Sequence, residues 1–293
     1  MKKFSPALFL VFLLFSTTPI WAQDVPDSTG LPGDNFSLEG ALAMFKKSSS
    51  PEEFEKLINI EDNGVNNLDL DGDGNIDYVK VIDKMEGDVH AFVLQVAVSE
   101  KENQDIAVIE LEKNDASSAQ LQIVGDEDIY GEQKIVEPSS DEATSFVAPP
   151  FEVTHGPAIS EYDNYSPDGI IVNVWMWPAV RFVYAPRYAV WVSPWSWRLH
   201  PVWWHPWRPL GWRVFYPRRA VYVRHYTVVT THRTVRAYRV YRPVRSTSVI
   251  VHTRTQVAVT RYRTTRRTTV VEEGPRGNRV KMHHGNGGRR RRH

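Results

Sequence analysis

The sequence contains no cysteine. This absence excludes disulfide bonds and zinc sites with thiolate ligands, so stability must come from packing and from any metal held by other ligands. The apolar run near the N-terminus, residues 7–15, is too short for a helix that spans a membrane. No cysteine follows it that could accept a lipid. We therefore expect no transmembrane span in the mature chain.

The N-terminus has the charge and hydropathy order of a secretory signal. Lys2 and Lys3 precede the apolar run, and Ile20-Trp21-Ala22 follows it before a polar stretch. We predict that residues 1–22 are a signal peptide cleaved after Ala22, with a retained membrane anchor as the alternative. The mature protein is then expected to be exported to the periplasm, the outer-membrane periphery or the extracellular space.

Arginine is absent from the N-terminal half, and acidic residues are almost absent from the C-terminal half. Residues 23–169 contain 33 Asp and Glu and 8 Lys, a net charge of −25, whereas residues 170–293 contain 25 Lys and Arg and 2 Glu, a net charge of +23. The chain as a whole is neutral. Such an asymmetry indicates either that the two halves have different partners or that the basic half docks on the acidic half.

The acidic half changes from helical to strand periodicity. Apolar residues at helical spacing, with serine N-caps, predict helices over residues 37–47 and 51–59. β-rich runs joined by short polar spacers follow at residues 76–82, 89–98, 106–111 and 121–124. Because short connections favour antiparallel neighbours, we predict an α+β domain over residues 36–137, with two N-terminal helices packed on an antiparallel β-meander. Residues 23–35 and 138–169 are predicted linkers.

Prolines interrupt the first part of the basic half. Nine of the ten tryptophans lie between Trp175 and Trp212, interleaved with prolines, which excludes a long helix and a regular central strand. We predict a Trp/Pro-rich β or extended region over residues 170–219. Residues 220–293 are rich in Arg, Thr, Val and Tyr, and we predict a largely disordered basic tail there.

The strongest chemical signal lies in residues 69–77, where carboxylates occupy alternate positions and glycines permit a sharp turn. Calcium takes about six to eight oxygen ligands, which such a loop can direct to one point. We predict a site for one Ca²⁺, with an acidic turn that holds no ion as the alternative. The predicted ligands are the side chains of Asp69, Asp71 and Asp73, the backbone carbonyl of Asn75, and Asp77 directly or through water.

The first nine positions of this loop resemble those of an EF-hand. The twelfth position is Lys80, where an EF-hand has a bidentate glutamate, and a strand pattern follows. In this respect the loop is more similar to the Asp-rich hairpin loops of integrin-type β repeats. Over residues 36–134, the chain resembles uncharacterised secreted bacterial proteins that carry an EF-hand-like calcium loop. That resemblance implies calcium binding and no particular biological role.

The basic half combines cations with aromatic rings. Arginine binds phosphate, sulfate and carboxylate through a planar fork, and tryptophan stacks on sugars and bases. We expect this half to attach to anionic glycan, lipopolysaccharide or another polyanion, or to a membrane surface. The alternatives are a compact aromatic β structure and docking on the acidic half. No motif that reads nucleic acid is present, so we expect no dedicated nucleic-acid partner.

The sequence contains no recognisable catalytic motif. A nucleophile with its base, a glycine-rich phosphate loop and a metalloprotease motif are all missing. His200 and His205 lack a third ligand at a spacing typical of transition-metal sites. We therefore predict a non-enzymatic, calcium-stabilised envelope or secreted protein. A secreted hydrolase or glycan-processing enzyme with an unrecognised site, and a calcium-responsive switch, are the alternatives.

Overall fold

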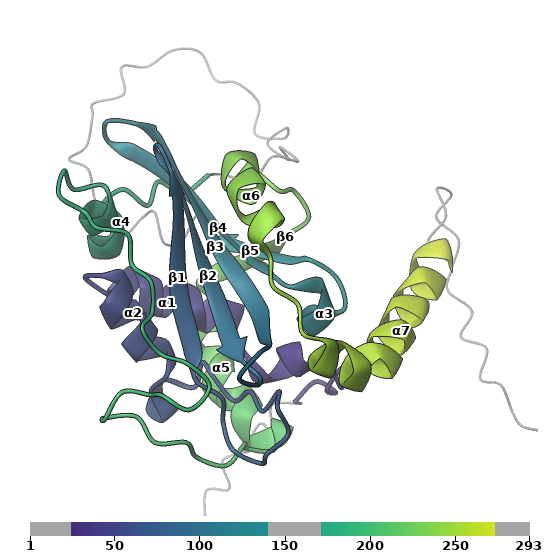
Figure 1. Cartoon of the computed structure of the whole chain (residues 1–293). Helices are drawn as coiled ribbons and strands as arrows, with labels where there is room; N and C mark the ends of the chain where they lie inside the picture. Colours follow the sequence, from purple (N-terminus) through teal and green to yellow (C-terminus); the bar gives the residue numbers. More distant parts are fainter. Residues whose placement is uncertain (1–24, 140–170, 273–293) are drawn as a thin grey trace, which may run out of the picture.

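The structure, a computed structural model, describes residues 25–139 and 171–272, and the side chains of the second range up to residue 266 (Figure 1). The predicted signal peptide, residues 140–169 of the linker predicted over residues 138–169, and the tail beyond residue 272 lie outside the described residues. The predictions made for those segments therefore stay predictions.

Two N-terminal helices begin where their caps predict. In α1 (Leu38–Lys47), the hydroxyl of Ser37 accepts a hydrogen bond from the N–H of Gly40 at 2.9 Å. In α2 (Pro51–Ile58), the hydroxyl of Ser50 accepts from the N–H of Glu53 at 3.2 Å. The Glu53 carboxylate accepts in turn from the N–H of Ser49, at 2.7 Å. This reciprocal arrangement satisfies backbone donors that would otherwise lack partners at the helix start.

The described strands form one antiparallel sheet in sequential order. They are β1 (Val79–Glu86), β2 (Val89–Ala97), β3 (Asn103–Asp115), β4 (Ser118–Gly125), β5 (Lys134–Pro138) and β6 (Tyr226–Val229). The first four strands confirm the predicted meander. The sixth comes from the basic half and pairs with β5, with Ile135 opposite Val229. The two halves of the chain therefore share one sheet.

Helices cover both faces of the sheet. α1, α2, α4 (Pro178–Val183) and α5 (Trp212–Val223) lie on one face, and α6 (Val235–Tyr241) lies on the other, as Figure 1 shows. The larger core forms under the first group of helices, with Phe45, Phe54 and Phe92 packed as a cluster of rings. Because β2 is covered on both faces, eight of its nine residues are buried. This burial on both faces explains why the sequence of β2 is almost entirely apolar and does not alternate between apolar and polar residues.

Helices also occur in the basic half, where we predicted an extended region and a largely disordered tail, so that part of the fold prediction is wrong for the described residues. Besides α4, α5 and α6, the described residues of this half include η4 (Arg242–Val244) and α7 (Val249–Glu272). The shorter elements of the acidic half are η1 (Pro32–Asn35), η2 (Glu61–Asn63) and α3 (Glu127–Tyr130). The chain between α4 and α5 is largely irregular, as its proline density predicts.

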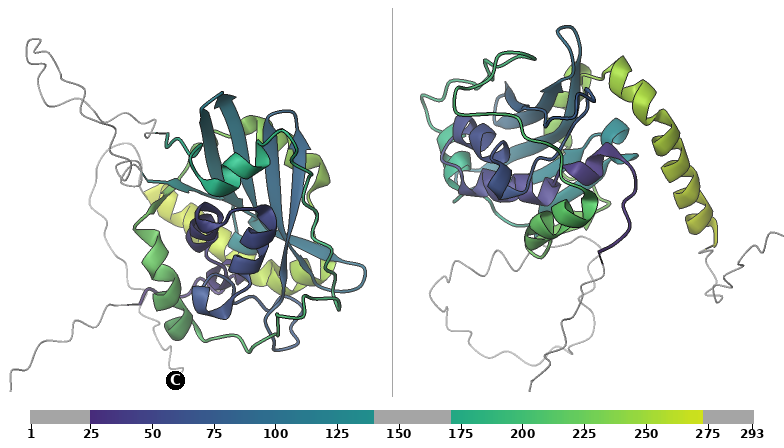
Figure 2. Two further views of the ribbon diagram at one scale, coloured as in Figure 1. Left: turned by 90° about the vertical axis from the view of Figure 1, so that its left-hand side faces the viewer. Right: turned by 90° about the horizontal axis from the view of Figure 1, so that it is seen from below.

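Helix α7 forms despite its many β-branched residues because its polar groups have specific partners. The hydroxyl of Ser248 caps the helix by accepting from the N–H of Val251 at 3.2 Å, and the hydroxyl of Thr255 donates to the carbonyl of Val251 at 2.9 Å. Arg263 also donates to the carbonyl of Gly131, at 2.5 Å. Figure 2 shows this helix at the edge of the molecule, with its C-terminal end extending away from the sheet. Tertiary contacts thus override a weak local helix propensity.

Candidate metal centre

The acidic loop of residues 69–77 lies between η2 and β1 and is held by hydrogen bonds to its own carboxylates. Asp69 accepts from the N–H groups of Gly72 and Gly74 at 2.7 and 3.0 Å, and Asp71 accepts from the N–H of Asp73 at 3.0 Å. Gly72 and Gly74 have φ angles of +74° and +84°, which side chains with a Cβ rarely adopt. The glycines therefore permit the turn that the aspartates stabilise.

Three carboxylates of the loop converge. Asp69, Asp71 and Asp73 each offer an oxygen, and these oxygens lie within 4.8 Å of one another. Asp69 and Asp71 are half-buried, and Asp73 is exposed. Three like charges at this separation repel one another, and a divalent cation would remove that repulsion. The arrangement therefore fits a hard cation with oxygen ligands.

Asp77 lies beside this group and is not part of it. Its carboxylate accepts a hydrogen bond from the N–H of Leu70 at 2.5 Å, across the base of the loop. The pKa of Asp77 is raised to about 8, mainly by burial; the nearby carboxylates of Asp71, Asp69 and Asp73 contribute to the rise, and the hydrogen bond from Leu70 opposes it. A direct or water-mediated role for Asp77 as a ligand stays a prediction.

The remaining positions of the predicted motif have other contacts. Asn75 donates its backbone N–H to Asp73 at 2.8 Å, and the use of its carbonyl as a ligand stays a prediction. Lys80 donates to the side-chain oxygen of Asn103 at 3.0 Å. The residue at the twelfth position therefore contacts β3, and a lysine cannot supply an oxygen ligand there.

The basic half contacts the acidic loop from two directions, which the sequence did not reveal. Arg254 of α7 donates to the carbonyl of Leu70 at 2.8 Å. A Cβ atom added at Gly72 would lie 2.7 Å from the guanidinium of Arg254, so the two segments are in close contact. The Trp197 indole donates to Asp71 at 3.4 Å, and the carbonyl of Trp207 accepts from the N–H of Ile76 at 2.8 Å.

A cavity of about 280 Å³ opens beside the loop. Asp71 and Asp73 contribute carboxylates to its lining, and Trp197, Arg198 and Trp204 contribute from the segment between α4 and α5. His200 also lines this cavity, and burial lowers its pKa. His205 is exposed and does not line the cavity. The cavity is thus built where the acidic and basic halves of the chain meet.

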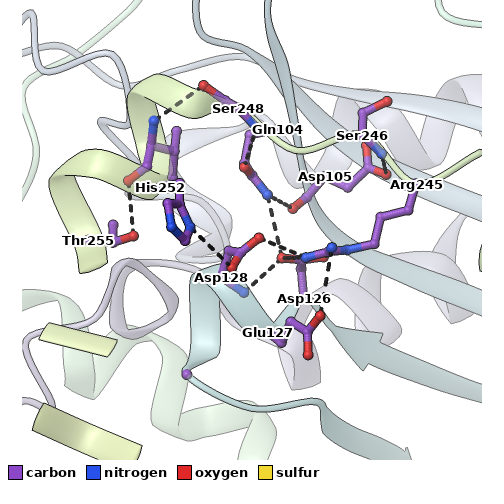
Figure 3. A network of polar contacts seen from close by, with 12 residues as sticks. Gln104, Asp105, Asp126, Glu127, Asp128, Arg245, Ser246, Ser248, His252 and Thr255 are labelled. Carbon is purple, nitrogen blue, oxygen red and sulfur yellow. Dashed lines mark hydrogen bonds and ion pairs between the residues drawn. The ribbon is translucent and has the colours of Figure 1, made fainter. Parts of the chain in front are cut away.

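Polar contacts join the two halves at several other places. Figure 3 shows Arg245 beside Asp126 and Asp128, and its guanidinium donates to these carboxylates at 2.5 to 2.9 Å. Further ion pairs link Arg219 to Glu39, Arg233 to Glu137 and Arg236 to Glu112. These are the contacts expected if the basic half docks on the acidic half.

A buried carboxylate of α2 also connects the halves. Glu55 is 2% exposed and accepts hydrogen bonds from Tyr78, from the backbone of Val81, and from Trp191 and Ser193. Burial raises its pKa, and these hydrogen bonds oppose the increase. Its donors come from both halves of the chain, so its observed role is to join β1 to the segment that follows α4.

Comparisons of the chain with protein-family models, with curated proteins and with solved structures give no match. In the part of the chain that the structure describes, no helix combines the length and the apolar character needed to cross a bilayer.

Proposed function

We propose that residues 69–77 bind one calcium ion and that the protein is a non-enzymatic, calcium-stabilised exported protein. The observation that carries the proposal is the convergence of the Asp69, Asp71 and Asp73 oxygens within 4.8 Å. Carboxylates at alternate positions of a glycine-containing loop are typical calcium ligands. The N-terminal signal pattern supports export, because it has the charged, apolar and small-residue order of a secretory signal.

A structural role for the ion follows from the position of the loop. The loop precedes β1 and also contacts Trp207 and Arg254 of the basic half. An ion that fixes the loop would therefore stabilise contacts between the two halves, in addition to the turn itself.

We propose that the outer surface of the basic half serves for attachment to polyanions or to an anionic membrane surface. Arg213 and Arg218 of α5 are exposed, and so are Val214 and Val221 of the same helix. Such a surface offers cations for phosphate or carboxylate groups together with apolar side chains. The arginines that pair with the acidic half are not available for this role.

Calorimetric and thermal titration of the full-length chain with calcium tests the proposed ion site. We expect one bound ion and a rise in melting temperature of about 5 to 10 °C at 100 times Kd, because binding to the folded state alone adds about 2.7 kcal/mol to the free energy of unfolding. Asp71→Asn and Asp73→Asn should each weaken binding about tenfold or more, because they remove a ligand charge.

Asp62→Asn is the matched control, because Asp62 is an exposed aspartate outside the loop. It should leave calcium affinity unchanged. Absence of calcium binding to the wild-type chain, or equal affinity in the loop variants and the wild type, would contradict the proposal.

A calcium-responsive switch is the second candidate function, supported by the contact of Arg254 with the loop. A bound ion would reorganise the loop around the Leu70 carbonyl to which this arginine donates, and so would change how tightly α7 is held. Hydrogen exchange of residues 249–266 with calcium and with a chelator measures this effect. We expect calcium to change the exchange rates several-fold; identical rates would exclude the switch while leaving the structural ion site intact.

A further inference from the structure

We propose that the cavity beside the acidic loop binds a saccharide that carries a carboxylate, such as a uronic acid unit, together with the calcium ion. The proposal rests on the calcium site proposed above and adds the chemical class and the location of a ligand. It identifies one defined site, distinct from the general cationic surface of the basic half.

One wall of the cavity is aromatic. Trp204 is almost fully buried and packs against His200 and Tyr78, with ring centroids 4.6 and 5.2 Å apart. Trp197 extends the wall to the acidic loop through its hydrogen bond to Asp71. Aromatic side chains that line a pocket together with polar groups provide apolar surfaces for the C–H faces of sugar rings. This wall therefore favours a ring-shaped polar ligand over a free inorganic anion.

The same cavity contains two cations. Arg198 lies over the ring of Trp197, 4.3 Å from its centroid, and Lys80, which also lines the cavity, donates to Asn103. Among the described residues, neither cation forms an ion pair with a carboxylate. A guanidinium presents several donors in a plane, so Arg198 retains donors for a ligand carboxylate.

A buried donor in the cavity wall also lacks a partner. The indole N–H of Trp204 has no hydrogen-bond acceptor in the described part of the chain, although this residue is only 5% exposed. Leaving a buried donor without an acceptor is unfavourable. The nitrogen itself has less than 1 Å² of accessible surface, so an acceptor in the cavity could reach it only after neighbouring side chains move. Trp204 therefore lines the cavity with its ring, and the inference depends on the aromatic and cationic side chains of the lining.

The acidic loop supplies few ligands for a complete calcium shell. Three carboxylates converge, and Lys80 replaces the glutamate that would provide two further oxygens in an EF-hand. Coordination positions are thus left for water or for oxygens of a ligand. A carboxylate and a neighbouring hydroxyl of a sugar can occupy such positions together.

Charge favours an acidic sugar only when the ion is present. Without a cation, Asp71 and Asp73 would repel a ligand carboxylate that enters the cavity. With calcium bound, three positive groups, namely the ion, Arg198 and Lys80, attract the carboxylate of the sugar. A neutral sugar gains neither the ion pair nor the stronger calcium ligand, so we expect calcium-dependent binding and a preference for the acidic form.

Calorimetric titration of the full-length chain with trigalacturonic acid tests the inference, beside galactotriose as a neutral control of equal length. Each sugar is titrated at saturating calcium and with a chelator, and blank titrations correct for binding of calcium to the sugar itself. We expect trigalacturonic acid to bind at least tenfold more tightly with calcium than with the chelator, and at least tenfold more tightly than galactotriose.

Arg198→Gln should weaken trigalacturonic acid binding about tenfold and leave calcium affinity unchanged. Arg208→Gln is the matched control, because Arg208 is an exposed arginine of the same segment that does not line the cavity. Calcium binding without binding of the acidic sugar would overturn this inference alone. Equal binding with the chelator, or equal effects of the two arginine variants, would also overturn it. Failure to bind calcium would overturn the proposed function as well.

Discussion

At the residue scale, burial of acidic side chains distinguishes the N-terminal half. Asp105 is fully buried and accepts hydrogen bonds from Gln95, from Tyr241 and from the backbone of Ser246. Burial raises its pKa to about 6, and the neighbouring carboxylate of Asp126 adds to the rise, while the hydrogen bonds oppose it. The fold thus tolerates a carboxylate that is easier to protonate than a free aspartic acid.

Asp105 should make stability depend on pH. Because its folded pKa lies above the ordinary value, the folded chain binds a proton that the unfolded chain has lost between about pH 4 and 6. The contribution of Asp105 to the free energy of unfolding should therefore fall by up to about 3 kcal/mol as pH rises through this window. Urea denaturation across the window should show a smaller fall for Asp105→Asn than for the wild type.

The Asp105→Asn variant can keep these hydrogen bonds. The asparagine oxygen can accept from Ser246 and Tyr241, and its amide NH₂ can donate to the Gln95 side-chain oxygen if the Gln95 amide group rotates by about 180°. Asp115→Asn, at the exposed turn between β3 and β4, is the control and should retain the wild-type dependence. An unchanged slope in Asp105→Asn would show that other groups cause the pH dependence.

At the element scale, the attachment of α7 depends on a glycine at the end of α3. Gly131 has a φ of +81°, and a Cβ atom there would collide with the ring of Tyr262. An alanine in the left-handed conformation costs roughly 1 to 2 kcal/mol. Gly131→Ala should lower the free energy of unfolding by more than this amount, because of the added collision, and should loosen the attachment of α7. Urea denaturation measures the cost, and hydrogen exchange of residues 249–266 measures the loosening.

Gly87→Ala provides the comparison, because Gly87 has a φ of +58° with open space around it. This variant should show the conformational cost alone. If the two variants lose equal stability and α7 exchanges at the same rate in both, then the Tyr262 contact does not hold the helix.

The elements that the sequence predicts are those in which local signals agree with the final packing. Ser37 and Ser50 cap α1 and α2 as predicted, and the β-rich runs become β1 to β4. The C-terminal helices were missed because their Val and Thr residues favour strands, and contacts distant in sequence decide their structure. Asp69, Asp71 and Asp73 were predicted from spacing. The wall formed by Trp197 and Arg198 was not, because no local pattern places it beside the loop.

At the scale of the whole molecule, two halves of opposite charge pack into one body. The arginine contacts are specific: Arg245 donates to Asp126 with two nitrogen atoms, at 2.5 and 2.8 Å, and also to Asp128 at 2.9 Å. A lysine cannot reproduce this fork. Because the acidic half contains no arginine, its carboxylates can obtain guanidinium partners only from the basic half of the chain.

Arg245→Lys should lower the free energy of unfolding by roughly 2 kcal/mol, because the charge remains while two donors to buried carboxylates are lost. Arg242→Lys is the matched control, since the Arg242 side chain is 49% exposed and lies 3.9 Å from Glu127; it should change stability by less than about 0.5 kcal/mol. Denaturation in urea compares the two. Equal losses would mean that net charge, and not fork geometry, holds the halves together.

The pairing of β6 with β5 has a consequence for how the chain reaches its native state. Residue 138 pairs with residue 226, so the edge of the nascent sheet stays open until most of the chain is available. Long-range pairing of this kind slows folding, and an open strand edge invites association with other chains. Late closure therefore delays completion of the sheet until the basic half of the chain has been synthesised. During that interval, the backbone N–H and C=O groups of β5 that later pair with β6 lack strand partners on that edge.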